Sequence, residues 1–276
     1  MIPLHGLLWY HRDMKKIVFT DIDGTLLNTR HELTARTKAA LEMAEACGIT
    51  IALCSGRAHD GLLDITDRLS FTPYLVTLNG AYIIDDAGNT VSEHFFTRDE
   101  LTELEAIRKS CGLGLLYFHS KHWAAPAHDS FYDDEYSIVK RPGTVCPVLE
   151  FEGKVHKYLT VGPAGQNRLF AEAAAKALPH LEIVPSSSRY TEVNTKGCDK
   201  GQGIADVCRY TGTDIKDTYC FGDYDNDIAM FRKAGTPIAM ANAVDKVKAL
   251  AAYTTLSCDE DGVAVALERI ISDNKR

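Results

Sequence analysis

The stretch IVFTDIDGTLL at residues 17–27 decides the fold of this chain. Residues 16–20 predict a buried strand, and Asp21 and Asp23 follow it directly. Gly24 then permits a turn that would be strained for other residue types. In an open α/β sheet, ligands bind in the loops at the carboxyl ends of the strands. The stretch therefore predicts a strand of such a sheet that ends in a polar site.

Strand and helix patterns alternate on both sides of a central interruption. Before it, we expect strands at 16–20, 49–54 and 74–78, with helices at 34–47 and 58–69. After it, we expect strands at 218–221 and 236–240, with helices at 199–210, 226–234, 244–250 and 262–272. Apolar strands that alternate with helices are typical of a parallel sheet covered on both faces. The fold class predicted is α/β, with a doubly wound, Rossmann-like parallel sheet.

The interruption mixes hairpins with helices. A hairpin is expected at 81–96, and Thr97 with Glu100 three residues later predicts a capping box that opens a helix. Further elements are expected as strands at 115–118, 122–125, 155–161, 181–184 and 190–194 and a helix at 166–178. We therefore predict an inserted α+β cap domain at 83–189 and a core domain made of residues 14–82 and 190–276.

Residues 1–13 differ from the rest of the chain. They have neither helix nor strand periodicity, and Met14 stands directly before the first strand. Two explanations remain open: a short surface extension, or a natural start at Met14. We favour the second, and we then expect residues 1–13 to be poorly ordered.

Composition excludes several classes of protein. The chain has 276 residues, 45% of them hydrophobic, and 30 Lys+Arg against 38 Asp+Glu give a net charge of −8. An acidic balance argues against a nucleic-acid surface, and no apolar run is long enough to span a membrane. The eight cysteines form no C-x-x-C pair and are expected as reduced thiols. We expect a cytoplasmic protein, as a monomer or a weak homo-oligomer.

Acidic residues recur after a later expected strand. Asp223, Asp225 and Asp227 follow the strand at 218–221. Carboxylates brought together at one sheet edge repel each other, so such a site needs a cation. A hard cation with oxygen ligands, Mg²⁺ first, suits these donors.

Two further segments suit a phosphate group. Ser55 and Gly56 follow the second strand, where a hydroxyl and backbone N–H groups can bind phosphate oxygens. Lys200 opens a helix and would add its charge to the helix dipole, with Lys196 as a nearby competitor. Each segment alone also fits an ordinary turn, a helix cap or a surface charge. Their joint position at strand ends and helix starts of one sheet favours a single site.

Together these segments resemble a known family. The motifs D-x-D-G-T-L, S-G-R, N-G-A, K-G and G-D-x-x-N-D occur in that order at residues 21–26, 55–57, 79–81, 200–201 and 222–227. The chain resembles the haloacid dehalogenase-like (HAD) phosphatase superfamily, in its Cof-type branch with a large α/β cap. The resemblance covers the chain from about Met14 to its end, and includes residues 239–243 and 261–264.

The resemblance implies catalytic roles for three residues. Asp21 looks like the nucleophile that forms an aspartyl-phosphate. Asp23 looks like the general acid that protonates the leaving oxygen and then the base that activates water. Lys200 would contact Asp21 and, with Ser55, hold the phosphoryl oxygens.

The resemblance also implies a binding shell. Mg²⁺ would be held by Asp21, Asp223 and the backbone carbonyl of Asp23, with Asp227 in support. The phosphate-binding set that joins Ser55 is Gly56, Asn79, Gly80 and Asn226.

The function expected is a Mg²⁺-dependent phosphatase that hydrolyses phosphate monoesters of small metabolites, such as sugar phosphates. Alternatives are a phosphomutase of the same fold, or a catalytically idle protein that binds a phosphorylated metabolite. Specificity should reside in the cap. Three cap histidines, His119, His122 and His128, could suggest zinc, but strand residues three apart face opposite sides, which disfavours a shared site.

Overall fold

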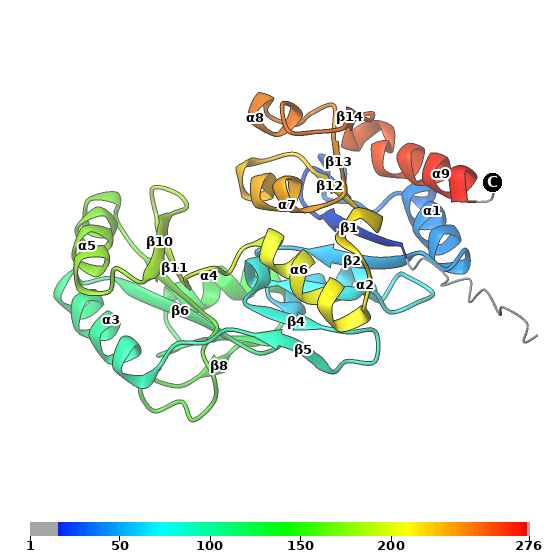
Figure 1. Cartoon of the computed structure of the whole chain (residues 1–276). Helices are drawn as coiled ribbons and strands as arrows, with labels where there is room; N and C mark the ends of the chain where they lie inside the picture. The colour runs from blue at the N-terminus through cyan, green and yellow to red at the C-terminus, as the bar shows by residue number, and fades with distance from the viewer. Residues whose placement is uncertain (1–15, 275–276) are drawn as a thin grey trace, which may run out of the picture.

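The computed structural model describes residues 16–274, which form two sheets with their covering helices (Figure 1). The expectations for residues 1–13 lie outside these described residues. One sheet belongs to the core and the other to the cap.

The core sheet has eight strands within the described chain, in the order β14-β13-β12-β1-β2-β3-β4-β5. Six of them run parallel: β1 (Ile17–Asp21), β2 (Thr50–Cys54), β3 (Tyr74–Thr77), β12 (Thr218–Gly222), β13 (Thr236–Ala239) and β14 (Tyr253–Thr254). The last two, β4 (Tyr82–Ile84) and β5 (Thr90–Glu93), add antiparallel pairs. The expected α/β fold with a parallel sheet is confirmed.

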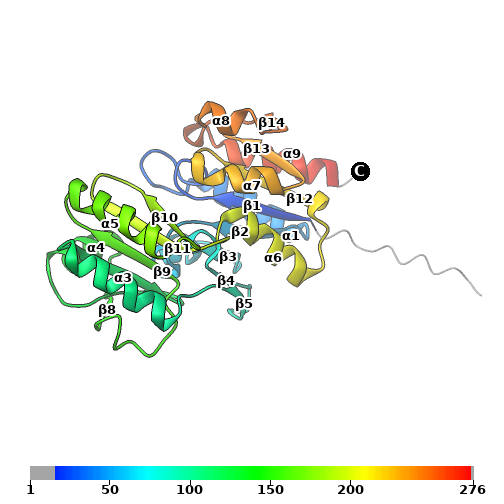
Figure 2. The same cartoon turned by 60° about the vertical axis from the view of Figure 1, so that its left-hand side comes forward.

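Helices cover both faces of the core sheet. Helix α1 (Ala35–Ala46) packs against α9 (Gly262–Asn274), and α6 (Lys200–Thr211) packs against α7 (Ile228–Lys233). Figures 1 and 2 show the two pairs on opposite sides of the strands. Two one-turn helices, α2 (Leu63–Thr66) and α8 (Asp245–Lys248), complete this half.

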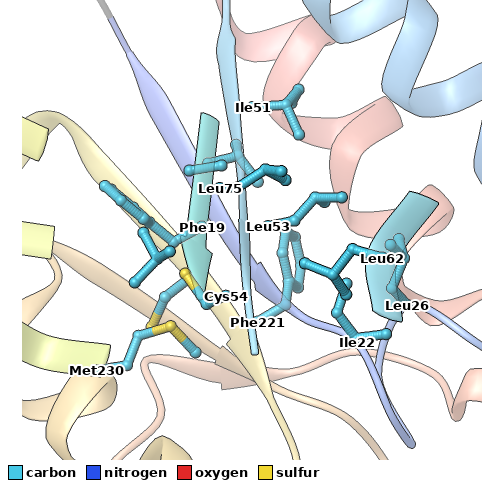
Figure 3. Packing of buried hydrophobic residues seen from close by; sticks show 14 of the residues in the cluster. Phe19, Ile22, Leu26, Ile51, Leu53, Cys54, Leu62, Leu75, Phe221 and Met230 are labelled. Carbon is cyan, nitrogen blue, oxygen red and sulfur yellow. The ribbon is translucent and has the colours of Figure 1, made fainter. Parts of the chain in front are cut away.

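Burial on both faces fixes the register of the central strands. In Figure 3, Leu53 of β2 points to one face, toward Leu62, while Cys54 points to the other, toward Met230. All four of these side chains are fully buried. A slip by one residue would exchange the two faces, so the register is strongly specified.

The cap sheet has six strands among residues 16–274, in the order β10-β11-β9-β6-β7-β8. Their bounds are β6 (Gly114–His119), β7 (His122–Ala125), β8 (Thr144–Val145), β9 (Lys157–Val161), β10 (Leu181–Pro185) and β11 (Tyr190–Thr195). Helices α3 (Arg98–Ser110) and α5 (Ala164–Ala177) lie side by side on one face of this sheet (Figures 1 and 2), and α4 (Ser130–Val139) packs against β6. The capping box expected at Thr97 and Glu100 is present.

Strands next to both predicted domain boundaries belong to the other sheet. The boundary at residue 83 assigned the hairpin β4–β5, apart from Tyr82, to the cap, yet the hairpin extends the core sheet, because Ile83 and Ile84 of β4 pair with β3. Conversely β11, assigned to the core by the boundary at residue 190, lies in the cap sheet between β10 and β9. These assignments were wrong because local sequence does not determine which ladder a strand joins.

A carboxylate buried in the cap gives a prediction about acid stability. Glu105 of α3 is 5% exposed, and its Oε1 accepts hydrogen bonds from Tyr158 Oη and Arg108 Nε, each over 2.7 Å. Burial raises the pKa of Glu105, but these hydrogen bonds outweigh burial and hold the pKa below 4.5. The resulting stability is complete above pH 4.5 and is lost as the pH falls through the pKa of the folded state.

We therefore expect Glu105→Gln to lower the free energy of unfolding by about 3 kcal/mol at neutral pH, because Arg108 loses its anion. The difference from the wild type shrinks as the pH falls below 4.5. Urea unfolding over a series of pH values measures both effects. Glu103→Gln, at an exposed position of the same helix, is the matched control. A difference that stays constant into acid would contradict this account.

Candidate active site

The register of the central strands brings the expected segments to one edge of the core sheet. Thr20 of β1 lies beside Phe221 of β12, and Asp21 lies beside Cys54 of β2. The residues that follow these strands therefore meet at the carboxyl edge.

A buried lysine joins two of the aspartates. Lys200, the first residue of α6, is 0% exposed, and its Nζ donates to Asp21 Oδ1 and, over 2.7 Å, to Asp227 Oδ1. Asp21 itself is only 6% exposed. Burial lowers the pKa of Lys200, but Asp21 and Asp227 more than compensate, so its pKa lies above the ordinary value. The ammonium is therefore held charged in the interior.

The loops around this lysine are braced by hydrogen bonds. Asp227 Oδ2 accepts from the backbone N–H of Asp223 over 2.9 Å and of Tyr224 over 3.1 Å. Thr25 Oγ1 donates to Asp223 Oδ1 over 2.7 Å. Gly24 has a φ of +80°, and a Cβ there would lie 2.6 Å from Asp223 Oδ2. Only glycine allows the loop that follows β1 to approach the loop that follows β12 this closely.

Three carboxylates share a small space. Asp21, Asp223 and Asp227 each place one oxygen within 4.8 Å of the others. Burial raises the pKa of Asp21 to about 7; Asp227 and Asp223 add to this and Lys200 opposes it. Burial also raises the pKa of Asp223. Three acids against one ammonium leave a deficit of positive charge, so an all-oxygen donor set of this kind fits a hard divalent cation such as Mg²⁺.

The carboxylate of Asp23 lies apart from this cluster. Arg57 grips it with two nitrogens, and the Nε–Oδ2 distance is 2.9 Å. His31 Nδ1 lies 3.5 Å from Oδ1, and the Asp23 side chain is 43% exposed. Two neighbouring acids thus occupy different environments, one buried beside an ammonium and one partly exposed beside a guanidinium.

Most of the expected phosphate-binding residues surround the same space. Ser55 is 2% exposed, and its Oγ accepts from the Arg57 backbone N–H over 3.1 Å. Gly56 lies against Asn79, where a Cβ would be 3.2 Å from Asn79 Oδ1. Asn79 has a φ of +56° and donates its N–H to the Ser55 carbonyl. Asn226 lies in the loop after β12 and lines the cleft together with Ser55, Gly56 and Asn79.

Gly80 differs from the expectation. It is buried and is not among the residues that line the cleft. Its φ is +98°, and a Cβ would lie 2.7 Å from the backbone oxygen of Asp199, the N-cap of α6. Gly80 therefore lets α6 approach closely, and its assignment to phosphate binding stays a prediction.

Three supporting residues have no role in the sequence-based prediction. Arg57 holds Asp23, and Thr25 holds Asp223. Asn242 donates to the Gly24 carbonyl over 2.7 Å and accepts from the Cys258 backbone N–H. All three lie inside the motifs that carry the family resemblance, so those motifs could have identified them as site residues.

Core and cap together enclose a cleft of about 1630 Å³ over these residues. Asp21, Asp23 and Lys200 line it from the core. The cap wall consists of Phe118, Trp123, Glu135, Ile138, Val139, Lys157, Leu159, Glu182, Val184, Pro185, Ser186, Glu192 and Asn194. The site therefore lies in a cleft between the two units.

The cap histidines do not gather into a metal site in the described residues. His119 and His122 are cross-strand partners of one hairpin with rings 5.9 Å apart, so treating them as residues of a single strand was wrong. His122 Nδ1 instead lies 2.8 Å from Asp60 Oδ2 of the core, and His128 pairs with Asp133. The metal-like group found among residues 16–274 is the aspartate cluster.

Comparisons with known proteins agree with this geometry. The family model for haloacid dehalogenase-like hydrolases matches residues 18–267. The 5-amino-6-(5-phospho-D-ribitylamino)uracil phosphatase YcsE of Bacillus subtilis (strain 168) is 28% identical over 255 residues, which cover 91% of this chain and 94% of that protein.

Two solved structures are similar over nearly the whole chain. A haloacid dehalogenase-like hydrolase from Bacteroides thetaiotaomicron superposes with a TM-score of 0.85 at 27% identity, covering 93% of this chain and 99% of that one. The HAD subclass IIB sugar phosphatase BT4131 superposes with a TM-score of 0.75 at 26% identity, with the same coverage of both chains.

The chain therefore belongs to the haloacid dehalogenase-like hydrolase family and is an enzyme of the phosphoric monoester hydrolase class. Within residues 16–274, no helix combines the length and apolarity that a membrane crossing requires.

Proposed function

We propose that this enzyme hydrolyses phosphate monoesters of small metabolites through an aspartyl-phosphate on Asp21, with Mg²⁺ as cofactor. The observation that carries the proposal is the buried Asp21–Lys200–Asp227 arrangement, with Asp223 beside it, at the cleft. Phosphoryl transfer depends mainly on positioning and on neutralising oxygen charge, and this arrangement supplies both.

Asp21 acts as the nucleophile in the first step. Lys200 holds Oδ1 of Asp21, so Oδ2 can turn to the phosphorus. An Oδ2–P bond forms while the ester O–P bond breaks, and Asp23 delivers a proton to the departing oxygen. In the second step water attacks the same phosphorus, Asp23 accepts the proton of that water, and Asp21 is released with inorganic phosphate.

Arg57 controls when Asp23 can act. Both oxygens of Asp23 are engaged by the Arg57 guanidinium. Asp23 must leave this pair, at least in part, before it can donate a proton. Arg57 is then free to turn toward an incoming phosphate, which makes it a positioning residue for both partners.

The metal would be held by Asp21, Asp223 and the backbone carbonyl of Asp23, with Asp227 and Asn226 in support. Bound there, Mg²⁺ supplies positive charge to the phosphoryl oxygens during transfer. The same charge corrects the imbalance of three carboxylates against one ammonium.

Metal removal tests this part of the proposal. After dialysis against EDTA, phosphate release is expected to fall to background and to return when Mg²⁺ is added. Asp223→Asn should raise the Mg²⁺ concentration for half-maximal activity by about tenfold or more, because a charged ligand is lost. Asp225→Asn in the same loop is the control, since Asp225 pairs with Lys246 outside the aspartate cluster. Undiminished turnover after chelation would disprove the metal dependence.

The substrate class proposed is sugar phosphates or similar small phosphate esters. The similarity to a subclass IIB sugar phosphatase and to a phosphatase of a ribityl phosphate supports it. Phosphate release from a panel of phosphorylated metabolites identifies the preferred ester. Release without formation of an isomeric sugar phosphate also separates hydrolysis from a phosphomutase reaction.

We also propose a branch, a cellular location and an oligomeric state for this protein. The branch is Cof-type, the location is cytoplasmic, and the protein is a monomer or a weak homo-oligomer. Eight free cysteines, five of them buried, support a reducing compartment.

A further inference from the structure

The cap sheet turns one face toward the catalytic cleft. Cross-strand partners lie on the same face, so the pairs Val184–Glu192 and Glu192–Leu159 share one face of β10, β11 and β9. Asn194, two residues beyond Glu192, lies on that face as well. Continuing the antiparallel register by one step places Asn194 beside Lys157.

The opposite face of this sheet is closed. Tyr158 and Val193 alternate with the residues above, and both are buried in a cluster with Leu104 of α3 and Phe170 of α5. Helices α3 and α5 therefore cover only the face that carries Tyr158 and Val193. The other face, which carries Lys157, Glu192 and Asn194 and is called the polar face below, lines the cleft that contains Asp21.

A buried lysine on this face pairs with a half-buried glutamate. Lys157 is 5% exposed, and its Nζ lies 2.8 Å from Glu192 Oε2 and above the ring of Phe118. Desolvating the ammonium is costly, and the attraction to the Glu192 carboxylate, whose side chain is 22% exposed, offsets part of that cost. Both residues line the cleft, so a ligand there would contact the pair.

An unsatisfied acceptor lies next to this pair. Asn194 is 4% exposed, and its buried Oδ1 has no hydrogen-bond partner among the described residues. A buried polar atom left unpaired costs about 1–3 kcal/mol. A hydroxyl group of a ligand in the cleft would satisfy it.

The charges of the cap wall select against anions. Among the described residues that line the cleft from the cap, Glu135, Glu182 and Glu192 face one cation, Lys157. On the core wall, the cations, which include Arg68 and Arg232, are outnumbered by aspartates. A second phosphate or a carboxylate on the substrate would meet net negative charge. Hydroxyl groups, which both donate and accept, suit carboxylates, an ammonium and an amide alike.

We propose that Lys157, Glu192 and Asn194 bind the leaving group of the substrate, and that they select phosphate monoesters of neutral polyhydroxylated compounds over esters that carry a second anionic group. This inference rests on the proposed function, because it assumes that the phosphoryl group is held at Asp21. The three residues set specificity and take no part in bond breaking.

The experiment compares substrates of equal size. Wild-type kcat/KM is measured for hexose, pentose and alditol monophosphates, for phosphorylated aldonates of the same chain length, and for p-nitrophenyl phosphate, which lacks hydroxyls. At least one neutral polyol phosphate should exceed its aldonate counterpart by about tenfold or more, since an uncompensated charge is disfavoured by at least this factor.

Two variants then test the named residues. Glu192→Gln and Asn194→Leu should lower kcat/KM for the best polyol phosphate by about 10- to 100-fold, because each removes polar contacts to the leaving group. Hydrolysis of p-nitrophenyl phosphate should change less than about threefold, because the phosphoryl site is untouched. Glu172→Gln, at an exposed position of α5, is the control.

The outcomes distinguish a failure of the proposed phosphatase function from a failure of the specificity role proposed for the cap residues. Absence of Mg²⁺-dependent p-nitrophenyl phosphate hydrolysis by the wild type would refute the proposed function itself. If that hydrolysis is present, equal losses on both substrates would assign Glu192 and Asn194 a structural role and overturn this inference. A wild-type preference for aldonate esters would overturn it as well, and that comparison does not depend on how any variant folds.

Discussion

Asp21→Asn is expected to lower kcat for every phosphate ester by more than about 10³-fold, because no covalent intermediate can form on an amide. The fold should survive. Asn has nearly the same shape, and the substitution removes a buried carboxylate whose pKa is already raised to about 7 by burial. Steady-state phosphate release measures the activity, and a thermal melt measures the fold.

Asp99→Asn, at an exposed position of the cap helix α3, is the matched control and should retain full activity. Residual turnover by the Asp21 variant above about 1% of wild type, a level that single removal of a covalent nucleophile does not leave, would refute the nucleophilic role. Mass spectrometry adds a direct test, since rapid acid quenching of the wild type should trap phosphate on the peptide that contains Asp21.

Lys200→Met should have the largest effect on stability of any single substitution in the site. Lys200 is 0% exposed and lies between Asp21 and Asp227, so its loss leaves two buried carboxylates without their cation. The free energy of unfolding should fall by about 3–5 kcal/mol, the usual result of removing one partner of a buried ion pair. Urea unfolding in the presence of EDTA measures the effect without interference from bound metal.

The double variant Lys200→Met with Asp227→Asn should recover part of this loss, because it removes one of the two stranded charges. Lys196→Met is the control: Lys196 is exposed and lies four residues earlier in the chain. A Lys196 variant with the larger defect would show that the wrong lysine was assigned to the site. A double variant less stable than Lys200→Met alone would contradict the charge argument.

The core half of the site could be predicted from sequence because the carboxyl ends of neighbouring parallel strands lie at the same edge of the sheet. Apolar strands fix their register through burial on both faces, so Asp21, Ser55 and Asp223 meet wherever such strands pair in parallel. Glycine positions added support, since Gly24 has a backbone conformation that other residues rarely adopt.

The remainder depends on contacts between distant segments. Nothing local distinguishes the hairpin β4–β5 from a cap hairpin, because its place is decided by the ladder with β3. The same holds for β11, which joins β9 across the cap sheet. The grip of Arg57 on Asp23 and the pair Lys157–Glu192 arise from side chains 34 and 35 residues apart, and neither spacing carries a periodic signal.

Asp227 has a consequence for how the enzyme meets its ligands. One of its oxygens is bound by an ammonium and the other by two backbone amides, so its orientation is determined before any ligand arrives. The conformational entropy of arranging the catalytic loop is lost once, when the chain folds, and is not lost again at each turnover. Preorganisation of this kind favours a rigid phosphoryl pocket in the core, and leaves adaptation to different esters to the cap.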